Sequence, residues 1–135
     1  MGQPLSTPSQ LRESALRTLQ IEQAAIGGLQ AKLDEQFDHA CQLILACQGR
    51  VVVTGMGKSG HIAGKLAATL ASTGTPAFFV HPGEASHGDL GMITRTDVVL
   101  ALSNSGETAE VTALLPLLKR LGTPLVSMTG RPGST

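Results

Sequence analysis

Residues 51–61 read VVVTGMGKSGH, and this stretch decides the fold because the hydrophobic period changes there. The three β-branched valines predict a short buried strand. The glycines that follow let the backbone turn tightly and approach a ligand, and a helix that begins there points free N–H groups and the positive end of its dipole at the loop. An anion is the natural ligand of such a loop.

Three kinds of ligand-binding loop compete for residues 55–60. A Walker A loop needs a glycine where the chain has Val52, so that pattern is not met. The G-x-G-x-x-G pattern of dinucleotide-binding folds is met, but its acidic ribose ligand is expected just after the second strand, where Glu84 comes late. A loop for a small phosphorylated metabolite is the third possibility. A plain tight turn would need the glycines but not the charge of Lys58 or the donor of Ser59.

Three more short apolar runs predict strands, at residues 78–80, 98–102 and 125–128. Because these runs are unbroken, we expect strands covered on both faces, as in a parallel sheet. The intervening helical segments then predict an α/β fold, with right-handed βαβ units in an open parallel sheet and flanking helices. Ligands of such sheets bind beyond the carboxyl ends of the strands.

Apolar spacing predicts one helix after the first strand and one after the third. The first helix carries Ile62, Leu66 and Leu70 at i, i+4 and i+8. The second carries an apolar face and also Pro116, which is expected to kink it or to remove a hydrogen bond. That face consists of Val111, Leu114, Leu115 and Leu118.

Residues 1–49 predict a helical segment that precedes the sheet domain at residues 50–135. Thr7-Pro8-Ser9-Gln10 offers an N-cap, a proline at the first helical position and a glutamine that completes a capping box. Apolar residues then recur at helical spacing, with a weak point at Gly27–Gly28. A second helix is expected from about Asp34 to Cys47. It should bury Phe37, Cys41 and Ile44 and stop at Gly49.

The long apolar face of the first helix predicts a homo-oligomer, in which this helix packs across a second copy of the chain; packing on its own domain is the alternative. Cys41 and Cys47 are too few for a disulfide framework or a zinc knuckle, so we expect buried, reduced packing residues.

Composition excludes several classes of partner. Ten basic residues balance ten acidic ones, and aromatic residues make up 2% of the 135 residues, so nucleic acid is not expected as a partner. No apolar run approaches the ~20 residues that span a bilayer, and the N-terminus lacks the pattern of a signal peptide. We therefore expect a cytoplasmic protein with no membrane partner.

Two further loops follow predicted strands. Residues 103–110 read SNSGETAE, and their hydroxyls and backbone amides could together surround a phosphate at a helix start, where a simple cap needs only one such residue. Glu110 lies one helical turn after Glu107 and could face the same pocket. Residues 81–89 read HPGEASHGD, whose two histidines and two carboxylates could bind a metal or move protons, although no tetrahedral set is complete.

The segments GMGKSG (55–60), HPGEA (81–85) with HGDLGM (87–92), and SNSGE (103–107) closely resemble the sugar isomerase (SIS) domain, and most closely the arabinose 5-phosphate isomerase family. The resemblance covers about residues 10–135. It implies a flavodoxin-like three-layer fold and the reversible conversion of ribulose 5-phosphate to arabinose 5-phosphate, which feeds the synthesis of the lipopolysaccharide sugar Kdo. A small-molecule sugar phosphate is then the expected partner.

The resemblance also assigns residues to the site. It implies catalytic roles for Lys58, His87 and Glu110, and it makes His81 a place where zinc can bind. The residues it implies for substrate binding are Gly57, Ser59, Gly74, Thr75, His81, His87, Ser103, Asn104, Ser105 and Thr108.

The chemistry of aldose–ketose isomerisation suits this set of residues. Moving a proton between C1 and C2 through an enediol needs a base, a donor to the carbonyl oxygen and an anchor for the phosphate, and it requires no redox cofactor. Glu110 is the candidate base with His87 as its rival, and Lys58 could stabilise the oxyanion or pair with the phosphate.

Two expectations qualify this interpretation. The resemblance stops at residues 130–135, whereas the family continues with a further strand, closing helices, another catalytic Glu and His, and usually a pair of CBS domains. We therefore expect a sheet truncated after its fourth strand, with weak or no turnover from this chain alone. The alternative function is a sugar-phosphate-binding module of a regulator, which would not need Lys58, His87 and Glu110 together.

Overall fold

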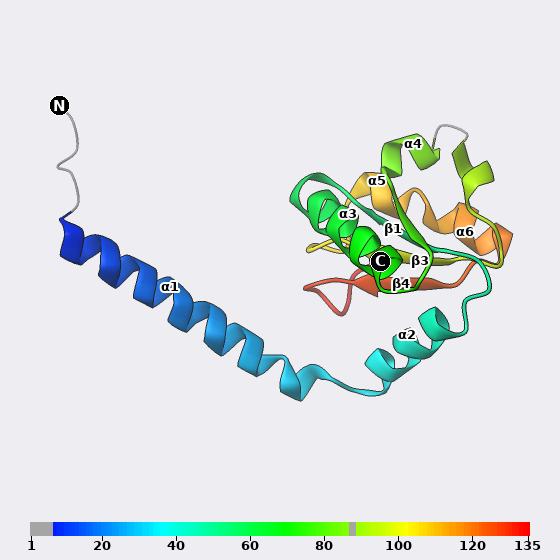
Figure 1. Ribbon diagram of the computed structural model, residues 1–135. Helices are drawn as coiled ribbons and strands as arrows, with labels where there is room; N and C mark the ends of the chain where they lie inside the picture. The colour runs from blue at the N-terminus through cyan, green and yellow to red at the C-terminus, as the bar shows by residue number, and fades with distance from the viewer. Residues whose placement is uncertain (1–6, 87–88) are drawn as a thin grey trace, which may run out of the picture. The chain divides into compact units, whose positions relative to one another are not determined.

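The computed structural model describes residues 7–86 and 89–135, and the described chain divides into two compact units, residues 1–39 and 40–135. Each unit is described by itself. In chain order the elements are α1 (Pro8–Gly28), the 3₁₀ helix η1 (Gln30–Lys32), α2 (Glu35–Leu45), β1 (Val51–Gly55), α3 (Gly57–Ser72), β2 (Ala77–Val80), α4 (Pro82–Ser86), η2 (Asp89–Met92), β3 (Val98–Leu102), α5 (Ala109–Thr112), α6 (Leu115–Leu121) and β4 (Leu125–Met128) (Figure 1).

The first unit begins with the predicted capping box. The Thr7 hydroxyl accepts the Gln10 N–H at 3.3 Å, the Gln10 side chain accepts the Thr7 N–H at 2.8 Å, and Pro8 opens the helix. Helix α1 ends at Gly28, where the glycine pair predicts weakness. Every described residue of this unit is exposed, and Phe37 is 50% exposed, so its expected burial is wrong: an apolar helical face is buried only when another element covers it.

The second unit is an open, all-parallel sheet of strand order β2-β1-β3-β4. Inner strands β1 and β3 are buried at every position, which confirms that they are covered on both faces. The same expectation is wrong for the two edge strands: Phe79 of β2 is 37% exposed, and Leu125 and Met128 of β4 are 37% and 54% exposed. An edge strand has one neighbour in the sheet, so the helices that cover the centre leave part of it open.

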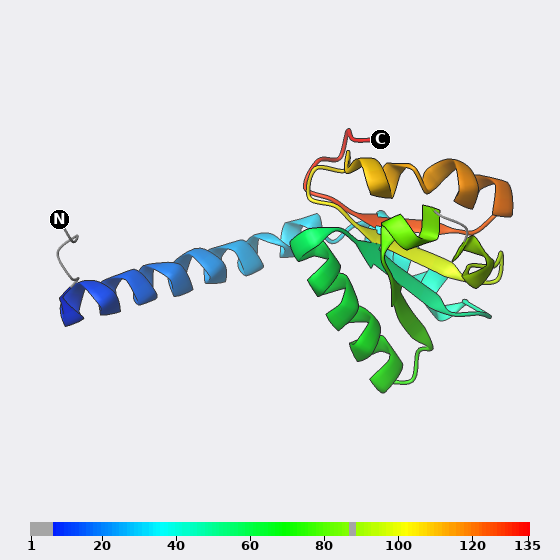
Figure 2. The same cartoon turned by 90° about the horizontal axis from the view of Figure 1, so that it is seen from above.

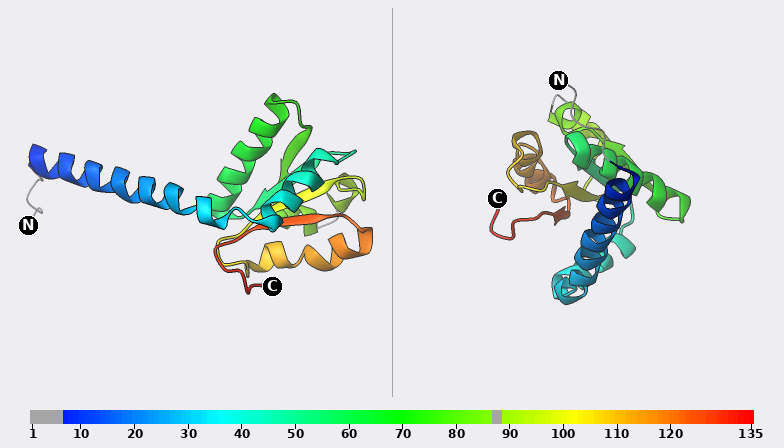
Figure 3. Two further views of the ribbon diagram at one scale, coloured as in Figure 1. Left: turned by 90° about the horizontal axis from the view of Figure 1, so that it is seen from below. Right: turned by 90° about the vertical axis from the view of Figure 1, so that its left-hand side faces the viewer.

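Two apolar layers flank the sheet, one on each face. The helices α3 and α6 lie on opposite sides of the sheet (Figure 2 and Figure 3). On one face Val52 and Val99 pack with residues of α6 such as Leu118. On the other face Val51 and Val53 pack with the small residues of α3. Successive side chains of a strand point to opposite faces, so one run of valines supplies both layers. The predicted helix–sheet–helix architecture is confirmed.

Both predicted helices of this unit form, with differences in detail. Helix α3 buries Ala63 and Ala67, while Leu66 is half-buried and Ile62 is 58% exposed. Pro116 divides the last predicted helix into α5 and α6, as expected for a residue without a backbone N–H.

At the amino ends of the strands, a buried carboxylate joins two loops. Asp97 is 3% exposed, and its two oxygens accept the backbone N–H groups of Arg50 at 2.7 Å and Thr94 at 2.8 Å.

Cys41 and Cys47 are free, as predicted, but half-buried rather than buried. Within residues 7–86 and 89–135, no helix combines the length and the apolar character needed to cross a membrane.

Candidate anion site at the carboxyl ends of the strands

The first turns of α3, which follows β1, and the carboxyl ends of β3 and β4 line one shared depression of about 380 Å³. Strands β1 and β3 are neighbours, and the chain leaves β1 toward β2 but leaves β3 toward β4. This is the topological switch point at which open α/β sheets bind ligands. The lining residues are Lys58, Ser59, Ile62, Leu102, Ser103, Asn104, Met128, Thr129 and Gly130.

The first loop is shaped by close packing at the start of α3. A Cβ atom on Gly60 would lie 2.6 Å from the carbonyl oxygen of Gly55, so only glycine lets the helix approach the end of β1 this closely. Gly57, at a φ of 54°, is in the left-handed region that favours glycine. This turn brings exposed Lys58 and half-buried Ser59 to the depression, at the positive end of a 16-residue helix.

The serine loop, residues 103–108, gathers hydroxyl groups at the end of β3. Ser103 is 8% exposed, and its hydroxyl accepts the N–H of Gly106 at 3.0 Å and lies 2.8 Å from the hydroxyl oxygen of Thr108. The N-cap residue of α5 is Thr108, the last residue of this loop. The Ser105 hydroxyl accepts the N–H of Glu107 at 3.1 Å.

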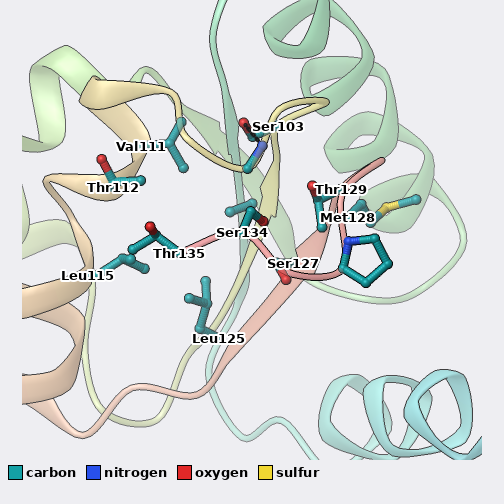
Figure 4. A pocket seen from close by; sticks show the side chains of 13 residues that line it. Ser103, Val111, Thr112, Leu115, Leu125, Ser127, Met128, Thr129, Ser134 and Thr135 are labelled. Carbon is teal, nitrogen blue, oxygen red and sulfur yellow. Dashed lines mark hydrogen bonds between the residues drawn. The ribbon is translucent and has the colours of Figure 1, made fainter.

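The tail segment, residues 129–135, lies against the serine loop. The N–H of Gly130 donates to the carbonyl oxygen of Asn104 at 3.1 Å, and Thr135 donates to the Glu107 carboxylate. Between α5, β4 and this segment is a cavity of about 130 Å³, lined by Ser103, Ser134 and Thr135 among others (Figure 4).

The sequence analysis did not include Thr129 and Gly130, which line the depression of about 380 Å³. Both residues follow a predicted strand, and ligands of parallel sheets bind beyond the carboxyl ends of the strands.

Glu107 is the charged group that these contacts affect. The backbone N–H of Thr135, then its hydroxyl, and also the nearby Arg131 guanidinium, hold the pKa of the Glu107 carboxyl below its ordinary value of 4.5. Hydrogen bonds to a carboxylate favour its charged form. Glu107 is therefore ionised at neutral pH and directed at the tail segment.

The structure brings together some of the predicted site residues and separates others. Glu110 is exposed in the first turn of α5 and is not among the residues that line the depression. Gly74 and Thr75 lie between α3 and β2, at the amino ends of the strands. Helix α3 rises about 24 Å along its 16 residues, so within one copy of the chain this pair is at the far end from Lys58.

Of the two histidines predicted for the site, the structure describes His81. His81 is exposed at the carboxyl end of β2, and its Nδ1 accepts the N–H of Gly83 at 3.1 Å. This hydrogen bond places the proton of the neutral ring on Nε2. The predicted catalytic residue His87 lies outside the described residues.

The zinc site that the resemblance implies at His81 stays a prediction. A zinc ion is usually bound by several His, Cys or acidic side chains. No three such residues gather anywhere in residues 7–86 and 89–135, and one nitrogen of His81 is already engaged with Gly83. His87 lies outside these residues, and no step below is derived through zinc.

Comparison with known proteins agrees with this geometry. Residues 44–135 match the family model described as the SIS domain. The chain is 66% identical over 121 residues to the arabinose 5-phosphate isomerase KdsD of Pseudomonas aeruginosa and 56% identical over 124 residues to that of Escherichia coli K12. These stretches are 90% and 92% of this chain, but the chain spans only 37% and 38% of the two relatives.

Solved structures extend the similarity to the fold. The structure of an E. coli CFT073 protein in complex with arabinose 5-phosphate matches with a TM-score of 0.90 and 46% identity, over 96% of this chain and 69% of that one. The NanR protein of Vibrio vulnificus complexed with ManNAc-6P matches with a TM-score of 0.70 and 26% identity, over 84% of this chain and 44% of that one. The parallel sheet, the loops at its carboxyl edge and the family match lead to one conclusion: the chain belongs to the SIS domain family.

Proposed function

We propose that this chain supplies the sugar-phosphate-binding part of an aldose–ketose isomerase that interconverts ribulose 5-phosphate and arabinose 5-phosphate, and so feeds Kdo and lipopolysaccharide synthesis. The observation that supports this proposal most directly is that Lys58 and Ser59 line the same depression as Ser103 and Asn104. The similarity to curated arabinose 5-phosphate isomerases, and to a structure that holds arabinose 5-phosphate, supports this substrate.

The serine loop is the proposed anchor of the phosphate. The hydroxyls of Ser103 and Thr108 already lie within 2.8 Å of each other, so little side-chain freedom is lost when an anion binds there. Ser105 and the backbone amides of the loop complete the anchor. Binding energy from the phosphate, which does not react, then positions C1 and C2 of the sugar.

The proposed reaction moves one proton between neighbouring carbons. In the direction of ribulose 5-phosphate, a base removes the proton from C2 of arabinose 5-phosphate, an enediol forms, and the proton returns to C1 as the carbonyl moves to C2. Glu110 is the proposed base, with His87 as its rival. Lys58 is the cation of the depression and would stabilise the oxyanion that develops on the substrate. The substrate is neither oxidised nor reduced overall, so the reaction requires no redox cofactor.

A homo-oligomer is part of this proposal. Gly74 and Thr75 are at the opposite end of the sheet from Lys58, so a contribution of this pair to the depression would come from a second copy of the chain. The apolar residues of α1, all exposed within the first unit, support the same arrangement.

A binding module without catalysis is the second candidate, and two observations favour it. Glu110 does not line the depression, and the similar NanR structure holds the sugar phosphate ManNAc-6P. The two candidates differ in one requirement: a binding module needs the serine loop, whereas an isomerase also needs a base and a cation placed at C1 and C2.

A chimera with a relative of known activity separates the two candidates. In it, this chain replaces the stretch of P. aeruginosa KdsD to which it is 66% identical. An isomerase predicts that the chimera converts arabinose 5-phosphate, and that Lys58→Ala and Glu110→Gln each lower kcat by at least about 100-fold. Glu35→Gln, on an exposed part of α2, is the control and should leave kcat unchanged. A folded chimera that binds arabinose 5-phosphate without converting it would favour the binding module.

A further inference from the structure

The carboxylate of Glu107 accepts hydrogen bonds from Thr135, the last residue of the tail segment. The backbone N–H of Thr135 donates to Glu107 Oε1 at 2.7 Å, and the Thr135 hydroxyl lies 3.0 Å from Oε1 and 2.8 Å from Oε2. Both carboxylate oxygens are thus engaged by one residue that is 28 positions further along the chain. Glu107 itself is exposed, so it is not fixed by burial.

A second set of contacts holds the other end of the tail segment. The carbonyl oxygen of Asn104 accepts the N–H of Gly130 at 3.1 Å and the hydroxyl of Thr129 at 3.5 Å. Between the two ends, the side chain of Ser134 lies so near Gly106 that a Cβ there would collide with it. The tail segment therefore contacts the serine loop near Asn104, at Gly106 and at Glu107, and a depression of about 430 Å³ lies between these contacts.

The residues that hold the tail also hold the serine hydroxyls. Gly106, at a φ of 69°, donates its N–H to Ser103 Oγ at 3.0 Å, and Glu107 donates its N–H to Ser105 Oγ at 3.1 Å. A movement of residues 106 and 107 would change both hydrogen bonds and with them the direction of the two hydroxyls. The position of Glu107 and the shape of the serine loop are coupled through the backbone.

We propose that Glu107 is a positioning residue: its hydrogen bonds with Thr135 fix the serine loop in the conformation that binds the phosphate group of the sugar. This inference rests on the proposed function, because it assigns the serine loop to the phosphate. Glu107 acts through Ser103 and Ser105 and has no chemical step of its own.

Charge alone predicts the opposite result, which makes the proposal testable. If Glu107 acted only as a negative charge near the anchor, its removal would strengthen phosphate binding, and alanine and glutamine would act alike. If it acts by position, removal weakens binding, and glutamine, which retains one acceptor oxygen, weakens it less than alanine. An exposed carboxylate contributes little to global stability, so the melting temperature should barely change.

The experiment measures the Kd of arabinose 5-phosphate by calorimetry for the unmodified chain, Glu107→Ala, Glu107→Gln, Thr135→Val and the double variant Glu107→Ala/Thr135→Val. We expect Glu107→Ala to raise the Kd roughly three- to tenfold, the range for residues that act on a site through neighbours. Glu107→Gln should raise it less. The double variant should bind no worse than Glu107→Ala, because Glu107→Ala already removes the carboxylate that the Thr135 hydroxyl contacts. Glu35→Gln, on an exposed part of α2, is the matched control and should leave the Kd unchanged.

A Kd that stays the same or falls in Glu107→Ala would overturn the proposal, as would equal effects of alanine and glutamine or additive effects in the double variant. Amide hydrogen exchange gives an independent readout. Glu107→Ala should speed exchange at Gly106 and Thr135 but not at Val52 in β1, and unchanged exchange at both would also contradict the proposal. If the unmodified chain fails to bind arabinose 5-phosphate, the proposed function fails, and the exchange result still decides whether Glu107 holds the loop.

Discussion

The hydroxyl oxygens of Ser103 and Thr108 lie 2.8 Å apart, although five positions separate the two residues in the chain. Ser103 is the first residue after β3 and Thr108 the residue before α5, so this contact closes the loop between strand and helix. It keeps two hydroxyls at the carboxyl edge of the sheet, where the depression with Lys58 lies. The contact is the basis on which the serine loop is assigned to an anion.

Removing the Ser103 hydroxyl should weaken the binding of a sugar phosphate. In Ser103→Ala, Gly106 and Thr108 both lose a partner, and the ligand loses a hydrogen bond to a charged group, so the Kd for arabinose 5-phosphate should rise about tenfold or more. Ser72→Ala, at the other end of α3, removes an exposed hydroxyl and is the control. Equal affinity of Ser103→Ala and the unmodified chain, measured by calorimetry, would remove Ser103 from the anchor.

Two glycines of α3 should respond in opposite ways to alanine. A Cβ on Gly60 would lie 2.6 Å from the Gly55 carbonyl oxygen, so Gly60→Ala should destabilise the fold by roughly 1–3 kcal/mol. At Gly64 a Cβ meets nothing within 4 Å, so Gly64→Ala should stabilise it by about 0.5–1 kcal/mol through helix propensity. Urea unfolding of both variants checks the pair. Similar effects of the two changes would show that the contact with β1 does not restrict Gly60.

The buried carboxylate at the other end of the sheet should be sensitive to a nearly isosteric change. Asp97 accepts N–H groups with both of its oxygens, and asparagine can accept with only one, so one backbone N–H would face an NH₂ group. Asp97→Asn should therefore lower the free energy of unfolding by about 1–3 kcal/mol. Asp38→Asn, on an exposed part of α2, should have little effect and is the control. Equal stability of the two variants would contradict this role of Asp97.

The hydrogen bonds between the Glu107 carboxylate and Thr135 should weaken only at acidic pH. Because the pKa of Glu107 in the folded chain is below its ordinary value of 4.5, the favourable contribution of the carboxylate is present above 4.5 and is lost as the pH falls through the lowered folded value. An NMR titration of the Glu107 side chain should show the lowered pKa, and Thr135→Val should move it back toward the ordinary value. A titration of Glu107 at or above 4.5 in the unmodified chain would contradict the contact.

Much of the fold could be predicted from short local patterns. The valine run that begins at Val51 predicts a buried strand because β-branched residues suit a pleated surface covered on both sides. Thr7 and Gln10 are specific for a helix start because both of their side chains must reach backbone N–H groups. Such patterns depend on neighbours in the sequence, so they do not require knowledge of the tertiary structure.

The errors come from contacts between distant parts of the chain. The periodicity that includes Ile62 marks an apolar face, but the smaller Ala63 and Ala67 are what α3 buries against the sheet. The hydrogen bonds between Glu107 and Thr135 join residues 28 positions apart, and no local pattern predicts them. Gly74 and Thr75 entered the site through the family resemblance, and the length of α3 separates them from the depression within one copy of the chain.

The most direct test of the account is a crystal structure of this chain with arabinose 5-phosphate. We predict that the phosphate lies at the serine loop, within hydrogen-bonding distance of Ser103 and Thr108, and that the sugar carbons extend toward Lys58 in the depression lined by α3, β3 and β4. A phosphate bound away from residues 103–108, with the serine loop empty, would contradict the central claim.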